Sequence, residues 1–152
     1  MISSITTLSP IGSLVLFAVW GLLLVITIGT WRLAMAISGN VPQGGFNPGT
    51  PHGGAAYWRL NRAHMNVVEN LPFFGAIVLG GSVLGIQDPN FQHLANIVLL
   101  ARVAQTIIHV SSGAQVAILL RFSAYLVQVF SMLGMAVMVL DAAGFLIPGM
   151  KQ

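Results

Sequence analysis

Five polar side chains stand out in an otherwise apolar chain: Arg59, Arg62, Asn66, Glu69 and Asn70. The chain has six Lys or Arg residues and three Asp or Glu residues, and three of these charges fall in this short segment. At about 100° per helical residue, the five side chains lie within an arc of about 100°. Guanidinium groups bind carboxylates through forked hydrogen bonds. We therefore interpret this surface, called the polar face below, as functional rather than merely solvated.

A second polar group shares one face of another predicted helix. Its members are Arg102, Gln105, Thr106 and His109, which also fall within an arc of about 100°. His64 lies on the side of its helix opposite the polar face. We expect His64 to contact a different helix or a neighbouring subunit.

The composition indicates that these helices lie in a membrane. Hydrophobic residues make up 56% of the chain, charged residues 6%, and the mean hydropathy is +0.87. Long apolar stretches without period-2 alternation favour helices over a β-barrel. We predict an all-α integral membrane protein, a single domain over 1–152, with four transmembrane helices in an up-down-up-down bundle. The predicted helices span residues 11–37, 58–86, 91–112 and 119–147.

Arg102 needs a partner inside such a bundle. An arginine at the centre of a membrane helix costs about 2.5 kcal/mol or more on insertion scales, and it usually points toward a partner or a cavity. We expect Arg102 to pair with Glu69, or with Asp141 if the depths match. One interpretation is a buried ion pair that fixes helix register, and the other is a ligand site.

The distribution of basic residues predicts the orientation. Arg32, Arg59, Arg62 and Arg121 belong to one side of the membrane, and Lys151 alone marks the other. The positive-inside tendency therefore places the first and third loops in the cytoplasm. The first loop, residues 38–54, is rich in Gly and Pro, and its His52 is expected to be exposed.

Several classes of chemistry are disfavoured by the sequence. The chain has no cysteine, so any thiol in a reaction must come from the substrate. No His, Asp or Glu residues have the spacing of metal ligands, so we predict no metal site. The pI is near 10.2, but the basic residues form no stripe, and we predict no nucleic-acid partner.

Residues 58–73 resemble the helix 2 signature of the MAPEG family, the membrane-associated proteins in eicosanoid and glutathione metabolism. The segment reads WRLNRAHMNVVENLPF, and the family pattern is E-R-x-x-R-A-[HQ]-x-N-x-x-E. Arg102 followed by His109 resembles the family's helix 3 pattern of arginine and, seven residues on, usually tyrosine. Arg32 and Arg121 fit its helix 1 and helix 4 arginines. The resemblance covers nearly the whole chain.

The resemblance implies a homotrimer in the lipid bilayer, with glutathione bound as co-substrate between neighbouring subunits. It implies that Arg121 is the catalytic residue that stabilises the glutathione thiolate. The residues it implies for glutathione binding are Arg32, Arg59, Arg62, His64, Asn66, Glu69, Asn70, Arg102, Gln105 and His109.

The sequence departs from the family at four of its motif positions. Trp58 stands where glutamate is frequent, and His109 stands where tyrosine is usual. Gln105 occupies a position that is often aromatic or histidine, and Asn70 one that is tyrosine in some members. An imidazole N–H can replace a phenol hydroxyl as a hydrogen-bond donor.

Three functions follow from these observations. The first is a membrane-bound glutathione transferase or peroxidase that acts on lipophilic electrophiles, in a bacterial inner membrane with the site facing the cytoplasm. The second is a non-enzymatic lipid-binding protein of the same fold. The third is a proton-coupled exporter, which is disfavoured because the first helix has no acid. Retention of Arg62, Asn66, Glu69 and Arg121 together favours the enzyme.

Overall fold

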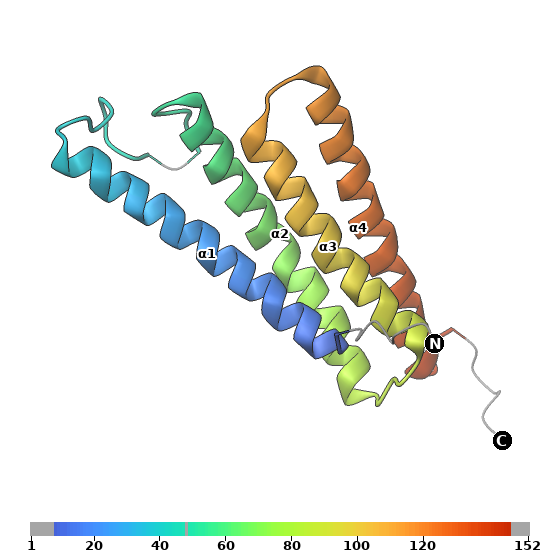
Figure 1. Cartoon of the computed structure of the whole chain (residues 1–152). Helices are drawn as coiled ribbons and strands as arrows, with labels where there is room; N and C mark the ends of the chain where they lie inside the picture. The colour runs from blue at the N-terminus through green and yellow to red at the C-terminus, as the bar shows by residue number, and fades with distance from the viewer. Residues whose placement is uncertain (1–7, 48, 147–152) are drawn as a thin grey trace, which may run out of the picture.

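The computed structural model describes residues 8–47 and 49–146, and it is built of four long helices. These are α1 (Pro10–Ile37), α2 (Ala55–Val83), α3 (Pro89–Ser111) and α4 (Gln115–Ala142). Successive helices run antiparallel (Figure 1). All four are long and apolar enough to cross a membrane. The predicted all-α, multi-pass architecture is therefore confirmed.

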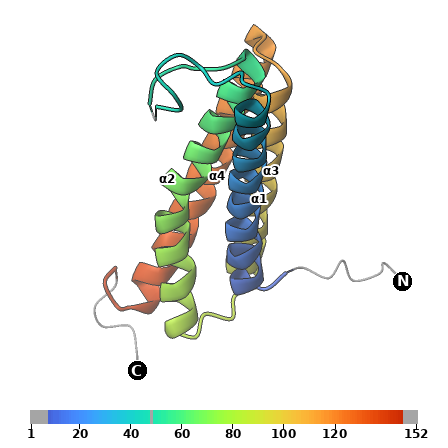
Figure 2. The same ribbon diagram turned by 90° about the vertical axis from the view of Figure 1, so that its left-hand side faces the viewer.

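The four helices pack as two layers, α1 with α2 and α3 with α4 (Figure 2). Both α2 and α3 contact all three other helices, whereas α1 and α4 do not touch within the described residues. The core is aromatic and aliphatic: Phe17 packs on Phe74 with ring centroids 5.3 Å apart, and Phe91, Val98 and Met135 are buried with them. The outward faces carry many exposed apolar side chains, as a lipid-facing surface requires.

The helix ends differ from the predicted bounds by a few residues. α2 begins at Ala55 rather than 58, after Gly54 in an extended conformation. α4 spans Gln115–Ala142 rather than 119–147. It ends early because the Phe145 N–H turns back to the Leu140 carbonyl at 2.9 Å, although the following residues are still apolar. Residue 147 lies outside the described part of the chain, as does Lys151.

Short polar caps begin two of the helices. The Ser9 side chain accepts a hydrogen bond from the Gly12 N–H, and the Asp88 side chain accepts one from the Asn90 N–H at 2.7 Å. A proline follows each cap at the first helical position. The Asp88 carboxylate therefore caps the start of α3.

The loop of residues 38–54 folds onto the start of α2. His52 is half-buried, with its ring 5.4 Å from the Tyr57 ring and 5.8 Å from the Trp58 ring. Phe46 packs on the same Tyr57 ring at 6.4 Å. The expectation that His52 is exposed was wrong, because this aromatic group shields its ring from solvent.

Close approach of α2 and α3 depends on Gly81. A Cβ at this position would lie 2.5 Å from Cζ of Phe91, which is 1% exposed. Gly85, which follows the same helix, has a different role. Gly85 adopts φ 70° in the turn that ends α2, where the Ile86 N–H bonds the Gly81 carbonyl.

We predict that Gly81→Ala lowers the stability of the protein by about 1–3 kcal/mol, because the added methyl displaces the Phe91 ring. Gly75→Ala in the same helix is the matched control, since its Cβ would meet only Leu14 Cδ1 at 3.9 Å. Thermal unfolding in detergent, followed by circular dichroism, measures both. Equal melting temperatures for the two variants would contradict the close-packing role of Gly81.

Candidate functional site

His109 and Arg121 meet where α3 ends and α4 begins. Nη1 of Arg121 lies 3.1 Å from Nδ1 of His109. A guanidinium only donates, so Nδ1 must accept and therefore carries no proton. In the neutral ring, the proton is then on Nε2. The contact thus fixes the tautomer of His109 and leaves an N–H donor on its other nitrogen.

Two further arginines approach His109 from α2. Nε of Arg59 donates to the Val110 carbonyl at 3.1 Å, which satisfies one of the last carbonyls of α3. Arg59, Arg62 and Arg121 all interact electrostatically with His109. Three guanidinium groups from two helices therefore act on one imidazole through their charge, and Arg121 is in hydrogen-bond contact with it.

The rest of the polar face lies deeper along α2. The Asn70 side chain donates to the Asn66 carbonyl at 2.8 Å, and both asparagines are half-buried. Glu69 is exposed on the surface of the subunit, and it interacts electrostatically with Arg102 of α3. No salt bridge joins the two side chains within the described residues, and Nε and Nη2 of Arg102 are buried without a hydrogen-bond partner there. The expected pairing of Arg102 with Glu69 is therefore not formed in the single subunit, where Glu69 acts on Arg102 only through its charge.

Arg102 and Gln105 lie beneath the surface rather than on it. Arg102 is 1% exposed, donates from Nη1 to Oε1 of Gln105, and holds its guanidinium carbon 5.6 Å from the centre of the Phe17 ring. Gln105 is 6% exposed. Within one subunit, both residues are therefore buried beneath the polar surface and contact other protein side chains rather than solvent.

Arg32 and His64 form a second group on the opposite side of α2. Nε of Arg32 donates to the Tyr57 hydroxyl at 2.7 Å, and its Nη2 donates to Asn61 at 3.3 Å. The guanidinium also lies over the Phe46 ring at 5.3 Å. A cavity of about 270 Å³ opens between α1, α2 and the first loop, and its polar lining is formed by Arg32, His52, Asn61, Arg62 and His64.

The predicted site residues are therefore split between two groups. The group on the α1–α2 side consists of Arg32 and His64. The group on the α2–α3–α4 side consists of Arg59, Asn66, Glu69, Asn70, Arg102, Gln105, His109 and Arg121. Arg62 reaches both, since it lines the second cavity and also interacts with His109. His64 lines the same α1–α2 cavity as Arg62 of the polar face, and its contact with a neighbouring subunit stays a prediction.

Four residues of the two groups were not predicted from the sequence. Tyr57 and Asn61 hold Arg32, Tyr125 interacts electrostatically with Arg102, and Gln128 bonds Gln105 at 3.2 Å. Helical spacing offered a signal for two of them, since Asn61 follows Tyr57 by four residues and Tyr125 follows Arg121 by four.

Charge is distributed very unevenly along the bundle. All five arginines lie in the half that carries the first loop or near the midplane, and only Glu69 accompanies them. The other two acids, Asp88 and Asp141, lie at the opposite end of the bundle. This excess of positive charge in a low-dielectric setting favours an anionic ligand.

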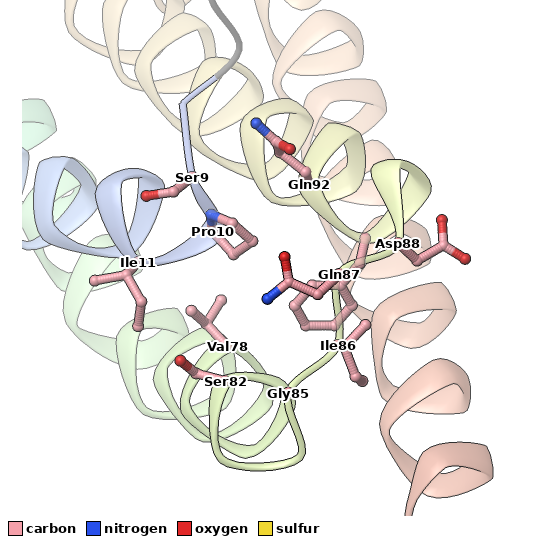
Figure 3. Close-up of a pocket in the computed structure, with 11 residues that line it drawn as sticks. Ser9, Pro10, Ile11, Val78, Ser82, Gly85, Ile86, Gln87, Asp88 and Gln92 are labelled. Atoms are coloured by element: carbon pink, nitrogen blue, oxygen red, sulfur yellow. The ribbon is translucent and has the colours of Figure 1, made fainter.

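A separate cavity of about 270 Å³ lies at that opposite end, between the start of α1, the end of α2 and the start of α3 (Figure 3). Gln87 points toward Pro10 across it, whereas the Asp88 carboxylate points away. No arginine or histidine lines it. We therefore place the functional site at the arginine-rich end.

Residues 8–47 and 49–146 contain no group of three His, Asp or Glu side chains placed to hold a metal ion. The fold and the site define a multi-pass, four-helix membrane protein with an arginine-rich candidate site at one end of the bundle. Residues 11–141 match the MAPEG family, and the chain belongs to that family. Its members include glutathione transferases and eicosanoid enzymes, most of them dependent on glutathione. A search of curated proteins finds no match.

We predict that Tyr57→Phe destabilises the protein by about 1.5–3 kcal/mol, because Arg32 loses a buried hydrogen-bond acceptor while the aromatic packing remains. Tyr125→Phe is the control, since Tyr125 is 40% exposed and Tyr57 is fully buried. Thermal unfolding of both variants checks this. A Tyr57→Phe variant as stable as wild type would show that the hydroxyl does not hold Arg32.

Proposed function

We propose that this protein is a membrane-bound glutathione transferase or peroxidase that acts on lipophilic electrophiles. The contact between Arg121 and His109 is the observation that carries the proposal. It places a guanidinium and an imidazole N–H donor together, with two more arginines in electrostatic range. Such a group of donors favours a bound anion, and a thiolate is the anion that the chemistry of the family supplies.

Glutathione matches the charges of the polar face. It carries two carboxylates, one ammonium and one thiol. Arg59 and Arg62 suit the carboxylates, Glu69 suits the ammonium, and the Asn66 and Asn70 amides suit the peptide groups. Arg102 and Gln105 act from behind, because both are buried within the subunit.

The catalytic step is attack of the glutathione thiolate on an electrophilic carbon. The thiol loses its proton to solvent, and the thiolate sulfur forms a bond to the carbon. In a substitution the bond from that carbon to the leaving group breaks, and the leaving group departs with the bonding electron pair. In an addition the displaced electron pair stays on the product and takes a proton from solvent. Lowering the thiol pKa from about 8.5 by two units requires roughly 2.7 kcal/mol of preference for the anion. A partly desolvated guanidinium such as that of Arg121 can supply it.

His109 acts as a donor in this scheme rather than as a base. Its Nδ1 accepts from Arg121, so Nε2 carries the proton in the neutral ring. That N–H can donate to the thiolate, as a phenol hydroxyl would. The histidine thus replaces the tyrosine that is usual at its position.

We propose that the protein works as a homotrimer, with one glutathione site at each subunit interface. Arg62 and Glu69 are both exposed on membrane-spanning α2, where an uncovered charge is costly. Arg32 and His64 lie on the other side of α2 from the polar face. A neighbouring subunit that covers Glu69 can bring its own Arg32 and His64 to the same ligand.

Electrophiles would enter from the bilayer, and an apolar groove of about 420 Å³ between α1 and α3 faces in that direction. The same groove favours the alternative function, non-enzymatic binding of a lipid. Saturable binding of a fatty acid, without a thiolate signal from glutathione, would support that alternative. We place the protein in a bacterial inner membrane with the arginine-rich end facing the cytoplasm, following the positive-inside tendency.

Native mass spectrometry in mild detergent should show trimers, and added glutathione should bind up to three per trimer. The physical reason is that one subunit holds only part of the residues that the ligand needs. A sample consisting only of monomers or dimers would count against the shared site.

Titration with glutathione at neutral pH should produce thiolate absorbance in the wild type. Arg121→Leu should bind glutathione within a few-fold of wild type, while the pKa of the bound thiol returns toward about 8.5. The conjugation rate should fall at neutral pH and partly recover at high pH. Arg121→Lys is the matched control, because it restores the charge without the planar fork.

Two results would contradict this assignment. Absence of thiolate absorbance in the wild type would reject the proposed transferase. Complete loss of glutathione binding in folded Arg121→Leu would make Arg121 a docking residue instead.

A further inference from the structure

Gln128 is a fully buried amide in the middle of membrane-spanning α4. Its Nε2 donates to Oε1 of Gln105 on α3 at 3.2 Å and to the Ala124 carbonyl of its own helix at 3.0 Å. A buried amide in a membrane span is costly unless it is bonded, and the Oε1 of Gln128 has no hydrogen-bond partner within the described residues. A packing role alone would be served by an apolar side chain.

Gln105 connects to α4 at a second point. Its Nε2 donates to the backbone carbonyl of Arg121 at 3.2 Å. Gln105 is thus tied to α4 at Arg121 and again at Gln128, about two helical turns apart. Two attachments fix both the rotation and the axial position of this part of α4 against α3.

The direction of these hydrogen bonds is forced by chemistry. Arg102 can only donate, so the atom of Gln105 that faces it must be Oε1. Nε2 of Gln105 then faces the Arg121 carbonyl, which can only accept. Gln128 must in turn present its Nε2 to the Gln105 oxygen. Neither amide of this hydrogen-bond network can be flipped, because a flip would place a donor against a donor or an acceptor against an acceptor.

We infer that Gln105 and Gln128 form an amide pair that positions Arg121 against His109. The inference rests on the proposed function for its catalytic consequence, since Arg121 is the proposed thiolate partner. Gln105 and Gln128 are then positioning residues that do not touch the reacting sulfur. Their position sets how well the Arg121 guanidinium stabilises the thiolate.

The first test measures the bound thiol. Gln128→Met removes one attachment and Gln105→Met removes both, with similar side-chain length. The apparent pKa of bound glutathione should rise by about half a unit in Gln128→Met and about one unit in Gln105→Met. Glutathione affinity should change little, because the groups on α2 hold the tripeptide. The charged groups that act on this thiol, Arg59, Arg62, Glu69 and Arg121, are unchanged in both variants.

The second test needs no glutathione. Histidine labelled with ¹⁵N reports the tautomer of His109 by NMR in the ligand-free trimer, with His109→Gln used to assign its signals. Wild type should show the Nε2–H tautomer with Nδ1 as an acceptor. Both Met variants should show a mixture of tautomers, more so in Gln105→Met, because Arg121 is no longer held beside Nδ1.

Met135→Ala is the matched control, a buried change on α4 that leaves the amide pair intact. It should lower the melting temperature without changing the thiol pKa or the His109 spectrum. If Gln105→Met and Gln128→Met both give the same His109 signals as wild type, the inference is overturned, even if their melting temperatures fall. Absence of thiolate in wild type would reject the proposed function, while the His109 spectra would still decide whether the pair positions Arg121.

Discussion

The buried guanidinium of Arg102 is the interaction on which the arginine-rich end of the bundle depends. A charge that is 1% exposed inside a membrane helix bundle has only protein groups to solvate it, and Nε and Nη2 of Arg102 have no hydrogen-bond partner within the described residues. Gln105 supplies the oxygen, and the Phe17 ring supplies a cation–π contact at 5.6 Å. Because Gln105 also bonds the Arg121 carbonyl and Gln128, solvation of Arg102 is coupled to the placement of α4.

The other arginines extend the same constraint to every helix. Arg59 closes the end of α3 through the Val110 carbonyl, and Arg32 of α1 is held by Tyr57 of α2. Each of these bonds uses only part of a guanidinium, which has five N–H donors. The remaining N–H donors carry positive charge that only one nearby acid, Glu69, offsets. This end of the bundle therefore favours binding of an anion.

The position of α2 explains why one subunit holds an incomplete site. α2 contacts α1 within its own layer and α3 and α4 in the other layer, and its polar residues are divided between these two sets of neighbours. Arg62 and Glu69 remain exposed on its outer surface. Covering that surface with a second copy would remove charge from contact with lipid, and it would also bring the two groups of site residues together. Assembly and ligand binding are therefore linked by the same electrostatic cost.

The sequence by itself determined the class of fold, because long apolar runs in a chain with few charges can satisfy their backbone in lipid only as helices. It also determined that the polar face lies on one side of α2, since helical periodicity fixes which residues share a face. It did not determine the ends of α4, the burial of His52 or the role of Gln128. The tertiary structure decided these, because each depends on a partner distant in the sequence: the Tyr57 and Trp58 rings for His52, and the Gln105 oxygen for Gln128.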